Sequence, residues 1–166
     1  MKNIFISRPT TINDDFESSY NLFHKFLTDN GHNLKRLGGG TYSKVAPLKA
    51  VINLIHECCG TIILGYPQYE FVHKAARSKK IQNEFRLVFP TPWNQIEGAL
   101  AFAFETPVLV IAHDGIEGGV FDHGITGEAV IHLDISKPNW HTTEQFIQPF
   151  DEWSKDVMNF EARKIS

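Results

Sequence analysis

PTPWNQIEGALAFAFE, residues 90–105, is the stretch from which the rest of the chain is best interpreted. Thr91 is a good N-cap residue, and Pro92 suits the first helical position, where the missing N–H of proline costs nothing. Apolar residues then recur at helical spacing, which predicts a buried stripe made of Ile96, Leu100 and Ala103 or Phe104. The small residues between them would let the helix lie close against a sheet.

Glu97 lies one turn inside this predicted helix. A carboxylate is costly to bury unless it is paired, hydrogen-bonded or protonated, so a glutamate on a buried helix is a candidate for chemistry. Trp93 precedes it by four residues and is expected to share its face of the helix. The alternative is a Glu97 that faces solvent near the helix N-terminus, where the helix dipole favours a negative charge.

Strand-like runs alternate with amphipathic segments on both sides of this helix. Continuous apolar runs at 61–64 and 107–112 are typical of parallel strands buried on both faces. Further strands are expected at 3–7, 33–37 and 129–135, and further helices are expected from Asn13 or Asp14 to Gly31, from Pro47 to Cys59 with Leu48, Val51, Ile52 and Ile55 buried, and at 142–164. Residues 71–80 show no clear period, and the alternation at 85–89 predicts a short edge strand or an extended segment.

The alternation predicts an α/β fold, with a doubly wound and mostly parallel sheet of about five strands and helices on both faces. With 166 residues, the chain suits one domain, which we expect to span 1–166 and to include the amphipathic C-terminal helix 142–164. In that helix, the buried stripe would be Phe146, Phe150, Trp153, Val157 and Phe160, with a kink at Pro149.

Composition excludes several classes of function. The net charge of −3, with both signs interspersed, gives no basic footprint for nucleic acid or an anionic membrane. A signal-peptide pattern and an apolar stretch of membrane-span length are both missing, so we expect a cytoplasmic protein. The adjacent Cys58 and Cys59 are expected to be small buried hydrophobic residues rather than a disulfide.

Polar residues gather where the expected strands end. In doubly wound sheets, the loops after the carboxyl ends of the strands meet and bind ligands. The first such loop carries Ser7, Arg8 and Thr10, and the loop after 61–64 carries Tyr66 and Gln68. The others contribute Trp93, Asn94, His113, Asp114, Asp122 and His123. We therefore expect these side chains to surround Glu97.

This set of residues favours chemistry at a glycosidic bond. The eight histidines lack the paired spacing of a metal site, and neither a Walker loop nor a nucleophile elbow is present. A carboxylate can stabilise an oxocarbenium-like ribosyl cation, attack it, or orient ribose hydroxyls. Trp93 or Tyr66 would stack on a base, and Arg8 would pair with a phosphate. The alternatives are an ion pair for Arg8, packing for Trp93 and turn formation for Asp122.

The motif Trp93-Asn94-Gln95-Ile96-Glu97 resembles the W-x-x-x-E spacing around the catalytic glutamate of Toll/interleukin-1 receptor (TIR) domains. The stretch from Glu97 to Ala103, followed by Pro107–Val110, is equally similar to nucleoside 2-deoxyribosyltransferases and deoxynucleotide N-hydrolases, in which the corresponding glutamate is the nucleophile. The asparagine after Trp93 departs from the cysteine common in plant TIR domains. The resemblance covers roughly residues 3–135 and implies a flavodoxin-like fold.

What the resemblance implies is cleavage or transfer of the N-glycosidic bond of NAD, or of a related nucleotide or nucleoside, through Glu97. The W-x-x-x-E spacing favours NAD, which would be a substrate rather than a cofactor. Ser7, Arg8, Thr10, Tyr66, Gln68, Trp93, Asn94, Asp114 and Asp122 would bind it. In a microbe, such a domain would serve antiphage signalling. The alternatives are a deoxyribosyltransferase or N-hydrolase, and a non-catalytic nucleotide-binding or self-assembling adaptor, for which a homo-oligomer is expected.

Overall fold

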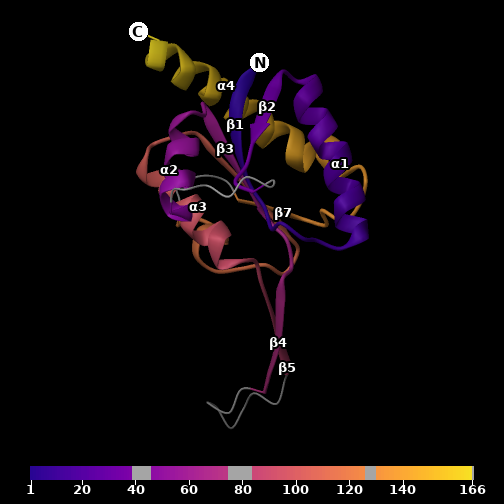
Figure 1. Ribbon diagram of the computed structural model, residues 1–166. Coiled ribbons are helices and arrows are strands. Elements are labelled where there is room, and N and C mark those ends of the chain that lie inside the picture. Colours follow the sequence, from indigo (N-terminus) through magenta and orange to yellow (C-terminus); the bar gives the residue numbers. More distant parts are fainter. Residues whose placement is uncertain (39–45, 75–83, 126–129, 166) are drawn as a thin grey trace.

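The structure is a computed structural model that describes residues 1–38, 46–74, 84–125 and 130–165. Its central element is a five-stranded sheet in the order β2-β1-β3-β6-β7, in which every neighbouring pair is parallel (Figure 1). The strands are β1 Lys2–Ser7, β2 His32–Lys35, β3 Gly60–Gly65, β6 Val108–His113 and β7 Val130–Leu133. The predicted α/β class with a parallel five-stranded sheet is confirmed.

Helices cover both faces of the sheet (Figure 1). Helices α1 (Asp14–Asp29) and α4 (Glu144–Ile165) pack on one face, in the core cluster that contains Ile4 and Ile6 of β1. Helices α2 (Pro47–His56) and α3 (Pro92–Ala103) lie on the other, where Phe5 clusters with residues of α2 and has residues of α3 packed against it. The side chains of successive residues of β1 therefore pack on opposite faces of the sheet, because side chains alternate along a strand.

The amphipathic patterns of α1 and α4 predict their buried faces correctly. The Asn13 side chain caps α1 by accepting a hydrogen bond from Phe16 N at 3.0 Å. Its buried residues include Phe16, Tyr20, Phe23 and Leu27, which recur in the sequence at the spacing of one helical face. In α4 the predicted residues Phe146, Phe150, Trp153 and Val157 are all buried, and Phe160 is half-buried; Pro149 lies inside the helix.

The prediction for α2 is wrong at its first apolar position and at its end. Leu48 is 47% exposed, and the buried residues are Val51 and Ile55. The helix stops at His56, and Gly60 is the first residue of β3 rather than a helix terminator. A Cβ at Gly60 would come within 2.6 Å of Val157 Cγ2. Gly60 is needed because α4 crosses close above the start of the strand.

The predicted stripe of α3 is also wrong. Ile96 is 41% exposed and Leu100 is half-buried, whereas the buried residues of the helix are Asn94, Glu97, Gly98 and Ala101. The apolar residues of this helix thus do not mark the face that meets the sheet. Hydrogen bonds to the strand ends, described below, explain why polar side chains are buried there instead.

Residues 69–74 and 84–89 form two strands, of which the sequence pattern predicts only one. Strands β4 (Tyr69–Lys74) and β5 (Glu84–Phe89) pair antiparallel and form a two-stranded ribbon separate from the main sheet. The strand expected at 85–89 is confirmed, but β4 falls in a stretch without a clear period. Figure 1 shows this ribbon projecting away from the sheet and helices.

The order of the strands defines where crossovers diverge. The chain passes from β1 to β2 on one side and then returns to β3 on the other side of β1. A ligand site in such a sheet is expected beyond the carboxyl ends of β1 and β3. None of the helices in the described ranges has the length and apolar character needed to cross a membrane.

Candidate active site

The start of α3 sits beside this switch point and is held by its own cap. Thr91 is the N-cap residue: its side chain accepts a hydrogen bond from Asn94 N at 3.3 Å, and Pro92 follows in the first turn, as predicted. The Thr91 hydroxyl also donates to Asn94 Oδ1 at 2.7 Å. Thr91 therefore orients the Asn94 side chain as well as starting the helix.

Asn94 joins α3 to both strands of the switch point. Its Nδ2 donates to Ser7 Oγ, at the end of β1, at 2.9 Å and to the carbonyl of Leu64, near the end of β3, at 3.3 Å. Both Asn94 and Ser7 are 1% exposed. A buried amide that satisfies its donors on two strands specifies one position of the helix over the sheet.

Glu97 completes this network one turn further along α3. It is 7% exposed, and the Ser7 hydroxyl donates a hydrogen bond to its carboxylate. Burial raises the pKa of Glu97 from 4.5 to about 7, and the hydrogen bond from Ser7 offsets part of that rise. Among the described residues, Glu97 is the one buried carboxylate, and no ion pair there involves it.

The order of donors has a chemical consequence. Ser7 accepts from Asn94 and donates to Glu97, so that its single proton is committed to the carboxylate. The carboxylate is thereby oriented without being neutralised by a cation. Near neutral pH it exists in both protonation states, which suits a group that changes charge interactions during a reaction. We call Ser7, Asn94 and Glu97 the carboxylate network.

Gln95 joins α3 to the loop that follows β6. Its Nε2 donates to the carbonyl of Gly118 at 2.9 Å, and its Oε1 accepts from Val120 N at 3.0 Å. Gly119 has a φ of +63°, and a Cβ there would collide with the Gln95 side chain. Sequence reasoning overlooked Gln95; its place between two residues of the motif is the signal that could have found it.

Arg8 is buried on the opposite face of the sheet and is already paired. Its two terminal nitrogens lie 3.1 and 3.3 Å from the carboxylate oxygens of Glu17, and its guanidinium lies 4.1 Å above the Tyr20 ring. The Arg8 side chain is 5% exposed and that of Glu17 is 42% exposed, so the ion pair is buried on the arginine side and open to solvent on the glutamate side. A phosphate that paired with both terminal nitrogens of Arg8 would have to replace Glu17.

Tyr66 is fully buried, with its ring edge-on to Phe16 at 5.3 Å between centroids. Burial raises the pKa of the Tyr66 hydroxyl, and no hydrogen-bond partner for this hydroxyl appears in the described part of the chain. The ring has no exposed surface on which a base could stack. Trp93, by contrast, is 42% exposed, one turn before Glu97, and its ring remains accessible to a ligand.

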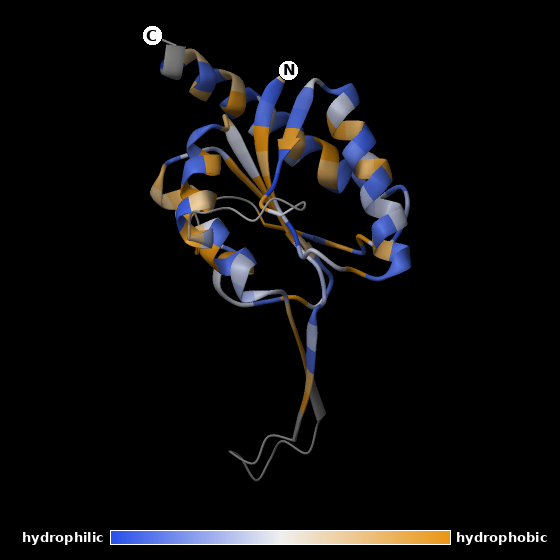
Figure 2. Ribbon diagram, viewed as in Figure 1, coloured by the Kyte–Doolittle hydropathy of each residue, from blue (hydrophilic) through white to orange (hydrophobic). Residues whose placement is uncertain are grey.

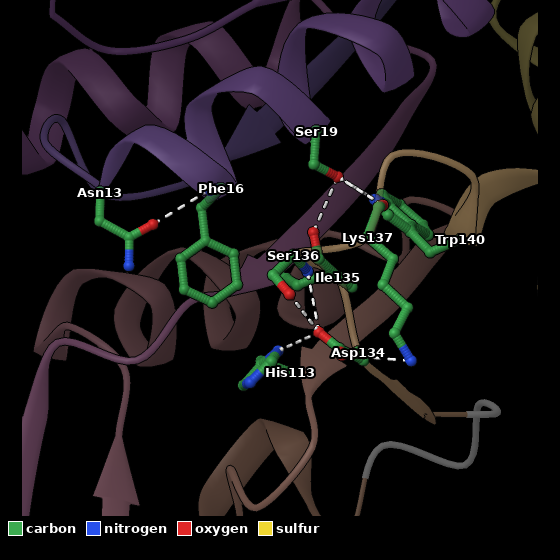
Figure 3. Close-up of polar contacts among 9 residues, drawn as sticks. All are labelled: Asn13, Phe16, Ser19, His113, Asp134, Ile135, Ser136, Lys137 and Trp140. Carbon is green, nitrogen blue, oxygen red and sulfur yellow. Dashed lines mark hydrogen bonds and ion pairs between the residues drawn. The ribbon is translucent and has the colours of Figure 1, made fainter.

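A second polar cluster lies at the ends of β6 and β7 (Figure 3). His113 Nδ1 lies 3.7 Å from Asp134 Oδ1, and the Ser136 hydroxyl donates to the same oxygen at 2.5 Å. This hydrogen bond lowers the pKa of Asp134. Asp134 and Ser136 are not among the residues that the sequence predicts for a site. The sequence Asp-x-Ser directly after a strand is a signal for an Asx turn, which could have found them.

The cluster is tied to α1 through Ser19 (Figure 3). The one proton of the Ser19 hydroxyl is shared between the carbonyls of Ile135 and Lys137, at 2.8 and 2.9 Å, and its oxygen accepts from Trp140 Nε1 at 2.9 Å. Phe16, also on α1, meets the His113 ring edge-on at 5.0 Å. These contacts fix the position of α1 against the loop after β7, which is a structural role.

The remaining predicted residues lie apart from the carboxylate network. Thr10 and Asp114 are exposed. Gln68 is half-buried, and its Nε2 donates a hydrogen bond to the carbonyl of Pro67. Asp122 accepts from Gly118 N at 2.6 Å and thus serves the turn chemistry that was the alternative for it. In the described ranges, no hydrogen bond joins any of these four to Glu97. Whether they touch a substrate stays a prediction.

Asp122 also lines a hollow outside the network. A cavity of about 340 Å³ lies beyond β6 and β7, and its lining includes Asp122, His123 and His132 but not Glu97. His132 Nε2 lies 3.1 Å from the carbonyl of Phe121, which occupies one ring nitrogen. In the ranges that the structure describes, no group of three His, Cys, Asp or Glu residues is placed to hold a metal ion.

Fold and site together define an α/β protein with a parallel five-stranded sheet and one buried carboxylate, among the described residues, at its switch point. Comparisons with protein-family models, with curated proteins and with solved structures find no match.

Proposed function

We propose that this protein cleaves or transfers the N-glycosidic bond of NAD or of a related nucleotide or nucleoside, with Glu97 as the catalytic carboxylate. The observation that carries the proposal is a carboxylate that is 7% exposed, hydrogen-bonded by Ser7 and located beside the carboxyl ends of β1 and β3. A carboxylate kept for stability alone would be expected to have a cationic partner when buried. Glu97 is buried without such a partner, and this burial raises its pKa to about 7.

The chemistry requires one negative charge near C1′ of the sugar. As the C1′–N bond breaks, its electron pair leaves with the base, and positive charge develops on C1′ and the ring oxygen. Ionised Glu97 would stabilise that charge, or attack C1′ to form a glycosyl ester. Water or an acceptor hydroxyl then bonds to C1′ and loses its proton to solvent; where an ester has formed, the C1′–O bond to Glu97 breaks in this step and its electron pair returns to the carboxylate. The low dielectric around Glu97 would strengthen the stabilisation.

The single buried carboxylate favours NAD within this substrate class. Nicotinamide in NAD is bonded as a cationic pyridinium and departs as a neutral molecule, so that it needs no proton from an acid. A purine or pyrimidine leaves more easily when an acid protonates it. Glu97 is the one buried carboxylate in the described ranges. It cannot be ionised to stabilise the charge at C1′ and also donate a proton to the leaving base in the same step.

The test is product formation from defined substrates. The purified protein is incubated with NAD, and separately with 2′-deoxynucleosides, and free nicotinamide or free base is measured. We expect nicotinamide release, a drop of roughly 100-fold or more in Glu97→Gln, and retained activity in Glu105→Gln, an exposed glutamate just after the same helix. In the wild type, kcat/KM should rise with pH through about 7, because ionised Glu97 is the active form. Full activity in Glu97→Gln would remove Glu97 from the mechanism.

A second candidate function is nucleotide binding without turnover, and the exposure of Trp93 favours it. Trp93 is 42% exposed and adjoins Asn94 of the carboxylate network, so that a base can stack on it without a reaction at Glu97. A binding module would be stabilised thermally by NAD or a nucleotide while leaving the ligand intact. The same incubations therefore distinguish the two candidates.

A further inference from the structure

A cavity of about 350 Å³ lies at the starts of β1 and β2, at the end of the sheet opposite to the carboxylate network. Figure 1 shows these strand starts and the later turns of α4 at the same end of the molecule. Figure 2 shows that β1 is hydrophilic at its start and hydrophobic further along, so the cavity lies at the margin of the core. The lining residues that decide its chemistry are Lys2, His32, Phe150, Asp151, Ser154 and Met158. We call it the strand-start cavity.

Strand register and helical spacing bring these side chains together. Lys2 and His32 are directly paired across the parallel strands β1 and β2, so their side chains point to the same face of the sheet. On α4, Phe150, Ser154 and Met158 are each four residues apart and therefore lie along one side of the helix. The His32 ring meets the Phe150 ring edge-on at 6.0 Å between centroids. The cavity is thus enclosed between two strand starts and one side of α4.

His32 is buried in the wall of this cavity with an unpartnered ring nitrogen. It is 6% exposed, and among the described residues its Nδ1 has no hydrogen-bond partner. Burial lowers the pKa of His32, and the ammonium group of Lys2 lowers it further. The ring is therefore neutral at pH 7 and carries one N–H donor and one lone pair that can accept.

Ser154 supplies a second unpartnered polar group. Its Oγ is buried, and no group in the part of the chain that the structure describes forms a hydrogen bond with it. The hydroxyl thus does not bond back to the carbonyl of Phe150, the usual partner of a serine inside a helix. Buried polar groups in native proteins have partners, because leaving them unpaired costs free energy. A molecule in the strand-start cavity is therefore expected to pair with His32 and Ser154.

The size and the apolar wall of the cavity suit a ligand larger than water. One water molecule takes up about 30 Å³, whereas pockets for small molecules begin at about 300 Å³. Met158 is 52% exposed beside the cavity, and its thioether can pack favourably against an aromatic ring. The cavity therefore offers two hydrogen-bonding groups in its wall and an apolar surface for the body of a flat ligand.

We propose that the strand-start cavity binds a small uncharged aromatic amide. The Ser154 hydroxyl would donate to the amide oxygen, and the amide N–H would donate to the lone pair of His32. This head group satisfies both unpartnered side chains at once. The proposal does not depend on the enzymatic function proposed above, although the nicotinamide that such an activity would release belongs to the same chemical class.

The charges around the cavity favour an uncharged ligand. Its lining includes Lys2 and Asp151, one group of each sign. Lys2 already forms an ion pair with Glu161, in which Nζ and Oε2 lie 3.2 Å apart. An anionic ligand would therefore meet two carboxylates and a neutral imidazole, and a cationic ligand would meet the ammonium group of Lys2.

NMR titration of the full chain with benzamide tests the proposal, and benzoate is the charged isostere. We expect saturable shifts of the Met158 methyl and His32 ring signals, with a dissociation constant of about 1 mM or lower. Benzoate should bind at least about tenfold more weakly at pH 7.5. Ser154→Ala should raise the dissociation constant of benzamide by about fivefold to tenfold, because it removes the donor to the amide oxygen. The matched control, Ser18→Ala at an exposed position of α1, should leave the constant unchanged.

The stability of Ser154→Ala separates ligand binding from a structural role. Without ligand, the hydroxyl has no partner among the described residues, so its removal should leave Tm unchanged or raise it. A fall in Tm of more than about 3 °C would show that the hydroxyl bonds within the protein, and it would overturn the proposal.

The titrations separate the possible occupants of the cavity. No saturable shift up to about 20 mM benzamide would assign the cavity to water and overturn the proposal. Benzoate that binds as tightly as benzamide would assign it to an anion held by Lys2, which also overturns it. Equal affinities of the wild type and Ser154→Ala would have the same meaning. Shifts confined to the surroundings of Glu97 would place benzamide at the carboxylate network instead. Release of nicotinamide from NAD is measured separately, so either proposal can fail without the other.

Discussion

Helices α3 and α4 both pack on the central sheet, yet they bury opposite kinds of residue. Helix α4 buries Phe146, Phe150, Trp153 and Val157, the apolar stripe that its spacing predicts. Helix α3 buries Asn94 and Glu97 and leaves Ile96 and Trp93 more than two-fifths exposed. One helix follows the hydrophobic pattern, and the other reverses it in its first two turns.

The difference follows from where each helix meets the sheet. Trp153 and Val157 of α4 lie against the start of β3 at Gly60, where the strand offers apolar atoms. The first turns of α3 lie over the carboxyl ends of β1 and β3, where Ser7 Oγ and the Leu64 carbonyl need hydrogen-bond partners. A polar face on α3 satisfies those groups. A departure from the hydrophobic pattern thus identifies the part of the fold that carries the candidate site.

The largest effect should come from the apolar side of the comparison. Phe146 is fully buried, and its ring packs against those of Phe23, Trp140 and Phe150. Phe146→Ala should lower the free energy of unfolding by about 3 to 5 kcal/mol, because it leaves a cavity in this cluster. Urea unfolding at fixed pH measures the loss. A loss below about 1 kcal/mol would show that α4 contributes little to the core.

The next effect should come from Glu97 and should depend on pH. The folded protein holds the Glu97 proton more tightly than the unfolded chain, because burial raises the pKa from 4.5 to about 7. The wild type should therefore lose stability as pH rises from 4.5 through 7, by about 3 kcal/mol in all. Glu97→Gln should be more stable than the wild type by about that amount above pH 7, and equal to it below pH 4.5.

Urea unfolding of both proteins at several pH values measures this difference. Glu105→Gln, an exposed change of the same chemistry, serves as the control and should show no such dependence. A Glu97→Gln variant whose stability tracks the wild type at every pH would indicate that the carboxylate is hydrated rather than buried.

A smaller effect is expected from Asn94. Asn94→Ala removes the donor that reaches Ser7 and the Leu64 carbonyl, and it leaves both acceptors buried without that partner. The free energy of unfolding should fall by about 2 kcal/mol. Ser7→Ala combined with Asn94→Ala should cost less than the sum of the two single changes, because they share one hydrogen bond. Additive losses in this double-mutant cycle would mean that the two side chains act independently.

The smallest effect should come from the apolar residue that α3 exposes. Ile96→Ser should change the free energy of unfolding by about 0.5 kcal/mol or less, since Ile96 is 41% exposed. Val157→Ser, on the buried face of α4, is the matched comparison and should cost several times more. If Ile96→Ser proved as costly as Val157→Ser, the reversal of the pattern in α3 would be disproved.

Much of the fold is predictable from local signals. The apolar runs at 61–64 and 107–112, the caps at Asn13 and Thr91 and the spacing in α1 and α4 all lie within a few neighbouring residues, and the structure confirms them. The pattern fails at β4, because Val72, on the face opposite Tyr69 and Phe71, interrupts the alternation of apolar and polar residues. It also fails at Gly60, which resembles a helix terminator until α4 is seen to cross it.

The candidate site is predictable in part. The sequence by itself determined that a glutamate would sit in the first turns of a helix after a strand and a cap, and that Ser7 would end the first strand. Only the tertiary structure decided that Asn94 and Ser7, 87 positions apart, would be bonded to each other and that Glu97 would be buried beside them. The same holds for the pairing of Arg8 with Glu17 and for the exposure of Phe71 on the ribbon of β4 and β5. The physical reason is that burial and hydrogen-bond partners depend on which distant segments the fold brings together, whereas helix starts and strand runs depend on neighbours in the chain.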